Sequence, residues 1–195
     1  YPSHMEVLTK SPATTAPANA AATDSFPING TDHLELYVGN AKQSAMYYQA
    51  ALGFEMVAYC GPETKVFDRV SYVMQQNKVR IILTSSLLPD TEIAQHVALH
   101  GDGVKVLALW VDDAERAYYT AVERGATSAF APKTLRDDDG EVIVAAIHTY
   151  GETIHTFMER SNYKGVFMPG FIARSNAYPS KSVGLQYVDH CVGNV

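Results

Sequence analysis

The sequence has no long hydrophobic run, no excess of basic residues and only 2 cysteines. No apolar stretch approaches the roughly 18 residues that a membrane-spanning helix requires, so we expect no membrane span. The 15 lysines and arginines stand against 21 aspartates and glutamates, and the resulting net charge of −6 argues against a nucleic-acid partner. Because 47% of the 195 residues are hydrophobic and 18% are charged, the chain is also too apolar to be wholly disordered.

The scarcity of cysteine favours a reducing compartment. Cys60 and Cys191 lie far apart in the sequence, and both stand among apolar residues. They could form one disulfide, but two reduced thiols in the core of a cytoplasmic protein are the favoured interpretation. No apolar segment of the kind found in secretory signals follows the N-terminus, which agrees with a cytoplasmic location.

Residues 1–25 have the composition of a disordered leader. A Ser-His-Met tripeptide that ends at Met5 resembles the remnant of an expression vector, followed by a natural start at that methionine. The residues after it are rich in alanine and threonine, but Pro12 and Pro17 interrupt any helix. We therefore expect the packed chain to begin at Phe26.

The first regular stretch, residues 31–84, predicts one helix among four strands. Asn29 and Gly30 precede it as a turn signal, and Gly53 is expected to end the helix. Alternating apolar residues or β-branched runs favour strands, and a helical spacing of apolar residues favours the helix. The expected order is a strand at 33–38, a helix at 41–52, and strands at 54–59, 66–74 and 79–83.

The same order returns in residues 104–160. A helix that carries His96 and His100 is expected before it, with Asp90 or Thr91 as its N-cap and with both histidines on the surface. Three aspartates followed by Gly140 predict a hairpin tip at 136–140. The expected order is a strand at 104–111, a helix from 112 to 124, a short strand near 129–130, and strands at 142–150 and 153–159.

Two copies of one βαβββ module determine the expected architecture. Neither module buries its apolar face alone, so we expect modules 31–84 and 104–160 to pair into an α+β domain over 26–160, with a curved mixed sheet, helices outside and an enclosed cavity. Residues 161–185, with their glycines and prolines, are expected to form an interdomain linker on the surface. Residues 186–195 repeat the Asp-His signature of the first strand, so we expect them to start a second, truncated domain.

This pattern resembles the vicinal-oxygen-chelate fold of glyoxalases and extradiol dioxygenases, and in detail the 4-hydroxyphenylpyruvate dioxygenase family. The motifs that carry the resemblance follow one another in order from Phe26 to the last residue, and the ordered set is far more specific than any one of them. They are Val-Gly-Asn-Ala-Lys-Gln at 38–43, Gly-Phe at 53–54, His-Gly-Asp-Gly-Val-Lys at 100–105, Thr-Tyr-Gly-Glu-Thr at 149–153, Asn-Tyr-Lys-Gly at 162–165 and Val-Asp-His-Cys-Val-Gly-Asn-Val at 188–195.

The resemblance implies an Fe(II)-dependent enzyme that converts 4-hydroxyphenylpyruvate and O2 to homogentisate and CO2 in tyrosine catabolism. It implies that His190 is the first iron ligand and that Val192 lines the substrate pocket. Family members hold iron with two histidines and one carboxylate, which leaves open positions for substrate and dioxygen. The other two ligands are expected beyond Val195, so we predict that this chain alone is inactive. The family also implies a homo-oligomer, either a dimer or a tetramer.

Two alternatives remain open at this point. A 4-hydroxymandelate synthase uses the same substrate and the same metal, and the pocket residues that separate it from the dioxygenase are expected outside this chain. A metal-free protein of the same fold that binds a small ligand is the other alternative. His33 occupies the place equivalent to His190, but we expect no metal there, because the matching carboxylate position falls on Thr156 and Glu159 faces the other way.

Overall fold

The computed structural model describes residues 26–193. Within them the chain forms nine strands, three α-helices and one 3-10 turn. The elements are β1 (Ile28–Tyr37), α1 (Ala41–Leu52), β2 (Glu55–Cys60), the 3-10 turn (Pro62–Thr64), β3 (Arg69–Gln76), β4 (Val79–Ser86), α2 (Glu92–His100), β5 (Gly103–Val111), α3 (Ala114–Glu123), β6 (Ser128–Asp137), β7 (Gly140–His148), β8 (Ile154–Glu159) and β9 (Ile172–Ala173).

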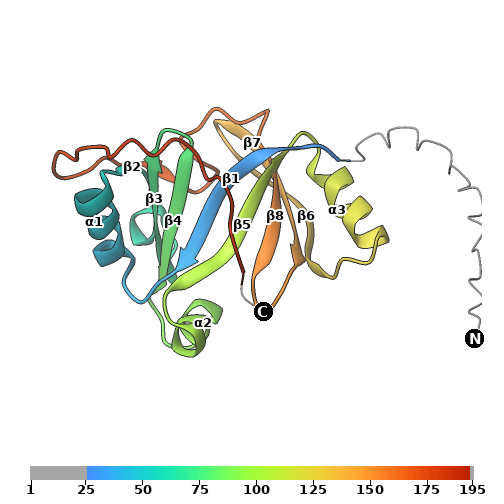
Figure 1. The fold of residues 1–195 in the computed structure, drawn as a ribbon, viewed down its shortest axis with the longest axis horizontal. Coiled ribbons are helices and arrows are strands. Elements are labelled where there is room, and N and C mark those ends of the chain that lie inside the picture. Colours follow the sequence, from blue (N-terminus) through green and yellow to red (C-terminus); the bar gives the residue numbers. More distant parts are fainter. Residues whose placement is uncertain (1–25, 194–195) are drawn as a thin grey trace, which may run out of the picture.

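All nine strands belong to one curved mixed sheet, in the order β6-β7-β8-β5-β1-β4-β3-β2-β9 (Figure 1). The first strand of each module is parallel to the last, since β1 pairs with β4 and β5 pairs with β8. The two modules meet where β1 and β5 run antiparallel along the centre of the sheet. The expected pairing of two βαβββ modules is therefore confirmed.

Local capping explains where the helices begin and end. Asn40 starts α1 by accepting a hydrogen bond from the backbone N–H of Gln43, and Gly53 ends it in a left-handed conformation. Asp113 caps α3 in the same way, through the N–H of Arg116.

In Figure 1, α1 and α3 lie toward opposite ends of the sheet, with α2 below its central strands. No helix among residues 26–193 is long and apolar enough to cross a membrane.

Alternating residues of the strands supply separate apolar clusters on the two faces of the sheet. In the first module, Ala41 and Ala45 of α1 pack with Met74 and Leu83. Neighbouring positions on the same strands turn the other way, where Val73 and Ile82 pack with Ala58 and Phe167. In the second module, α3 packs on Val111, Ala145 and Phe157. Helices α1 and α3 thus each cover one face of their own module, while the other face is left for the segment after β8.

The start of β1 differs from the sequence prediction. Asn29 and Gly30 were expected to form a turn, but both lie inside β1, which begins at Ile28. The register against β5 shifts between Ile28 and Gly30, and Gly30 has a φ of 148°, which a residue with a side chain rarely adopts. The glycine therefore marks an irregularity in the strand. The strand expected near 129–130 is also longer than predicted, since β6 has 10 residues.

The segment after β8 is more closely packed than a surface linker. Ile172 and Ala173 form β9, which adds a ninth strand against β2. Phe167 is only 1% exposed and ranks among the most buried side chains of the chain. The expectation of a linker lying on the surface is therefore wrong at Phe167, whereas Ile172 and Ala173 are exposed. An apolar ring gains more from filling the uncovered face of the first module than from contact with water.

The segment that the sequence predicts as a new strand, 186–195, carries no strand as far as residue 193. Lys78 donates its backbone N–H to the carbonyl oxygen of Gln186, and Val188 packs against the first-module core. A strand needs a neighbour that offers a ladder of hydrogen bonds, and no such ladder forms along the described part of this segment. Residues 194–195, like the expected leader at 1–25, lie outside the described residues.

Candidate functional site

His190 is paired with the aspartate that precedes it. Its Nδ1 lies 2.6 Å from Oδ2 of Asp189, and both side chains are exposed, at 72% and 74%. Because an ionised carboxylate only accepts hydrogen bonds, this contact has Nδ1 donating its proton and leaves the lone pair on Nε2. A carboxylate that orients a histidine in this way is common around metal-binding histidines. His190 therefore presents an exposed imidazole that is oriented by the neighbouring carboxylate.

The other ligands that Fe(II) requires are not present in the described part of the chain. Residues 26–193 contain no group of three or more histidine, cysteine, aspartate or glutamate side chains that could hold a metal ion. Glu159, the nearest carboxylate to the expected ligand position in the first domain, accepts a hydrogen bond from the backbone N–H of Ala114 instead. One imidazole does not meet the requirements of a site with two histidines and one carboxylate, so the described residues fit iron only in part.

Val192 lies away from the sheet interior, with 84% of its surface exposed. Together with Cys191 it lines a cleft of about 250 Å³ beside Tyr150 and His155. The Nδ1 atom of His155 is buried and has no hydrogen-bond partner among the described residues. Cys191 is exposed, whereas Cys60 is buried, and both thiols are free. The expectation of a core position is thus confirmed for Cys60 and wrong for Cys191.

The first module contains a buried counterpart of the Asp189–His190 pair. Nδ1 of His33 lies 2.6 Å from Oδ1 of Asp32, and each side chain is only 5% exposed. Phe167 packs edge-on against the His33 ring, with 5.4 Å between the centroids. The same two residue types therefore form the same contact twice, once in water and once inside the sheet.

Arg160, the first residue after β8, completes the buried pair. Its Nε donates to Oδ2 of Asp32 at 2.7 Å, and its Nη2 donates to Oδ1 at 2.8 Å. It also donates through Nη1 to the backbone carbonyl of Phe167. Burial raises the pKa of Asp32, but the hydrogen bond from His33 and the charge of Arg160 outweigh it and lower that pKa from 3.8 to about 2. Asp32 is therefore a carboxylate held in its ionised form.

A larger cleft, of about 660 Å³, opens beside this cluster at the end of the sheet where β1 begins and β5 ends. Its size is within the range of small-molecule sites. Asp32, Arg80 and Arg160 line it together with Trp110 and Tyr187. Sequence reasoning did not single out Arg80, Trp110 or Arg160. The available signal was an arginine inside the otherwise apolar strand at 79–83.

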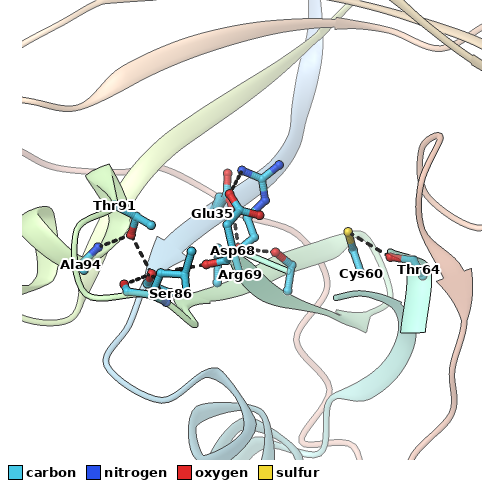
Figure 2. A network of polar contacts seen from close by, with 11 residues as sticks. Glu35, Cys60, Thr64, Asp68, Arg69, Ser86, Thr91 and Ala94 are labelled. Atoms are coloured by element: carbon cyan, nitrogen blue, oxygen red, sulfur yellow. Dashed lines mark hydrogen bonds and ion pairs between the residues drawn. The ribbon is translucent and has the colours of Figure 1, made fainter. Parts of the chain in front are cut away.

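A second polar network crosses the first module without forming a metal site. Thr84 donates to Oε1 of Glu35 at 2.7 Å, and the Thr84 hydroxyl lies 2.8 Å from that of Ser71. Figure 2 shows the region around Glu35, where Ser86 also contacts Thr91, the residue that caps α2. These contacts give each buried hydroxyl a partner, so their role is structural.

The histidines of α2 differ from the sequence interpretation in part. His96 is 9% exposed and packs edge-on against Tyr37, although both α2 histidines were expected on the surface. His100 is the more exposed of the two, and its Nε2 lies 2.8 Å from Oε2 of Glu152. Burial lowers the pKa of His96, which is typical of a neutral core histidine.

Comparison with known proteins agrees with this fold. Residues 30–157 match the model of the Glyoxalase/Bleomycin resistance protein/Dioxygenase superfamily. The chain is also similar to a methylmalonyl-CoA epimerase from Mycobacterium tuberculosis, with a TM-score of 0.56, 18% identity and coverage of 73% of this chain and 94% of that one. At that identity the likeness concerns the fold alone.

More similar proteins carry the 4-hydroxyphenylpyruvate dioxygenase name. That of Tetrahymena thermophila is 45% identical over 175 residues, covering 85% of this chain and 43% of the relative. That of Coccidioides posadasii is 43% identical over 192 residues, covering 90% and 48%. A variant of 4-hydroxymandelate synthase from Streptomyces coelicolor superimposes with a TM-score of 0.68 at 28% identity, over 76% of this chain and 42% of that one.

The chain spans less than half of the length of these two dioxygenases. Their similarity nevertheless extends over most of the present sequence, well beyond the residues matched by the superfamily model. The chain belongs to the Glyoxalase/Bleomycin resistance protein/Dioxygenase superfamily and is homologous to the N-terminal part of 4-hydroxyphenylpyruvate dioxygenase.

Proposed function

We propose that this chain is part of an Fe(II)-dependent dioxygenase that converts 4-hydroxyphenylpyruvate and O2 to homogentisate and CO2. In this proposal the paired modules are a scaffold, His190 is the first iron ligand and Val192 contributes to the substrate pocket. The observation that carries it is the Asp189–His190 contact of 2.6 Å, which leaves Nε2 free for a metal. The identity of 45% to a relative of that name supports the choice of substrate.

The two Asp-His pairs have different roles in this proposal. His33 is buried under Phe167 and bound to a carboxylate that Arg160 already neutralises, so it acts as part of the core. His190 has the same aspartate contact but is open to solvent, so its imidazole is available to a metal that other ligands complete. When bound, Fe(II) would supply the redox chemistry and the positions for the 2-oxo acid and dioxygen.

The proposal is tested first on this chain and then on a protein that joins it to the remaining region of its relatives. Anaerobic calorimetry of the chain alone should show no tight, stoichiometric Fe(II) binding. In the longer protein, His190→Ala should abolish both iron retention and homogentisate formation. The matched control is His148→Ala, because His148 is also an exposed histidine and lies on β7. Tight iron binding by the chain alone, or full turnover by His190→Ala, would contradict the proposal.

A second candidate is 4-hydroxymandelate synthesis from the same substrate, again with Fe(II). The superposition on a 4-hydroxymandelate synthase variant at 28% identity favours keeping it. Product analysis of the longer protein after incubation with 4-hydroxyphenylpyruvate separates the two, since one predicts homogentisate and the other 4-hydroxymandelate. We place the dioxygenase first because the chain is 43% to 45% identical to two relatives of that name.

Self-association and a cytoplasmic location complete the proposal. Met46 and Tyr47 of α1 and nearby Tyr178 expose much of their apolar surface, which is typical of a contact face. Sedimentation of the longer protein should give a dimer or a tetramer. Two free thiols agree with a reducing compartment.

A further inference from the structure

The cleft of about 660 Å³ contains more basic groups than its carboxylates can satisfy. Both oxygens of Asp32 are used by the guanidinium of Arg160, and one of them is also used by His33. The other lining carboxylate, Asp112, accepts a hydrogen bond from Asn29. Arg80 therefore shares a carboxylate whose strong contacts are already made.

The guanidinium of Arg80 lies 5.5 Å from the centre of the Phe167 ring, but its polar contacts are long. Its Nε lies 3.4 Å from Oε1 of Gln75, and its Nη1 lies 3.7 Å from Oδ1 of Asp32. A guanidinium carries five N–H donors, and strong contacts to a carboxylate are nearer 2.8 Å. Within residues 26–193 its two terminal amino groups have no hydrogen bond of normal length. The side chain is only 24% exposed, and burial lowers its pKa, so its charge is incompletely compensated by the protein.

The rest of the cleft offers an apolar surface beside this charge. Trp110, although 46% exposed, lines it together with Val111 and Val188. Lys78 also lines it and has no ion pair among the described residues. A flat aromatic side chain and a guanidinium that line the same cleft suit a ligand with an anionic head and an apolar body.

We propose that this cleft binds a small carboxylate with a flat apolar body, its anion against Arg80 and its body against Trp110. The site would be distinct from the one containing His190, which does not line this cleft. The proposal does not depend on the dioxygenase function, because it uses only the folded modules and the segment that follows them.

Trp110 is the only tryptophan of the sequence, so its fluorescence reports on this cleft alone. The experiment titrates the complete chain with phenylacetate, with phenylacetamide as an uncharged ligand of the same shape and with inorganic phosphate as an anion without a ring. We expect a saturable change with phenylacetate, and binding at least tenfold weaker for phenylacetamide and for phosphate, because hydrogen bonds to charged groups and ring burial both contribute.

Variants at Arg80 test the role of the charge. Arg80→Gln should weaken phenylacetate binding about tenfold or more, and Arg80→Lys should retain part of it. The control is Arg116→Gln, which removes an exposed arginine of α3 that does not line the cleft. Should Arg80→Gln fail to fold, the wild-type titrations and Arg80→Lys decide the matter.

Three titration results with the wild-type chain would overturn the proposal. They are the absence of any saturable change with phenylacetate, equal binding of phenylacetamide, and equal binding of phosphate. The first result would show that the cleft does not bind this ligand. The second would show that the guanidinium does not recognise the charge, and the third that Trp110 does not contribute to binding. Equal loss in Arg80→Gln and Arg116→Gln would likewise show a general effect of net charge.

Discussion

Arg160 binds both carboxylate oxygens of Asp32, through contacts of 2.7 and 2.8 Å that join residues 128 positions apart in the sequence. Asp32 lies on β1 and Arg160 directly follows β8, so this pair links the first strand of the first module to the end of the second. The same guanidinium holds the backbone of Phe167. The two modules and the segment after them are thus connected at one buried carboxylate.

Replacing Asp32 with asparagine should be strongly destabilising. The substitution leaves Arg160 partly buried without its anion, and breaking such a pair typically costs about 3 kcal/mol or more. We expect a loss of about 3 kcal/mol in the free energy of unfolding, measured by urea denaturation. The control is Asp68→Asn. Asp68 is half exposed and its contact with Arg69 is long, at 3.8 Å, so this substitution should change stability by less than about 0.5 kcal/mol. Equal effects of the two substitutions would contradict the assignment.

The lowered pKa of Asp32 predicts how its contribution depends on pH. The folded protein holds that pKa at about 2, below the 3.8 of an unperturbed carboxyl, so the folded state favours the ionised form. The resulting stability is present above pH 3.8 and is lost as the pH falls toward 2. A shift of nearly two pH units corresponds to about 2 kcal/mol. Urea denaturation of wild type and Asp32→Asn should show the gap between them shrinking by about this amount between pH 5 and pH 2, and a constant gap would refute it.

Phe167→Ala should show that the segment after β8 belongs to the core of the first module. The ring is 1% exposed and contacts His33 and Phe171, and removing such a ring typically costs about 3 to 5 kcal/mol. The matched control is Phe67→Ala, because Phe67 is 68% exposed. Its effect on urea denaturation should stay below about 0.5 kcal/mol. A small effect at Phe167 would mean that the segment is detached in solution.

The sequence was sufficient for the module order because that order rests on local signals. Alternation, helical spacing and capping residues such as Asn40 and Asp113 act within a few positions, and the elements that they predict are present. What the sequence missed depends on distant partners. Nothing local to Phe167 indicates that it fills the sheet face beside His33, and nothing local to Arg160 indicates that it reaches Asp32. The turn predicted at Gly30 was wrong although its signal is local. A turn and an irregularity within a strand can both use a glycine with a positive φ, so the residue type does not separate them.

The sequence predicted the Asp-His motif of the candidate site but not the surroundings of that motif. The repeat of Asp-His at 32–33 and 189–190 is visible in the sequence, and both pairs form the same contact. Their difference in burial is not visible there, because it depends on what covers each strand. The cleft beside Arg80 was missed because its lining comes from five separate parts of the chain.

The two cysteines should react differently with a thiol reagent in the native state. Cys191 is exposed and Cys60 is buried, so we expect one thiol per chain to react rapidly with Ellman's reagent and the second only after denaturation. Partial burial raises the pKa of the Cys191 thiol, so its reaction should accelerate with pH beyond the range of an unperturbed thiol. Cys191→Ser should remove the rapid phase, whereas Cys60→Ser should leave it intact. Rapid reaction of both thiols in the native protein would show that the sheet around Cys60 opens readily.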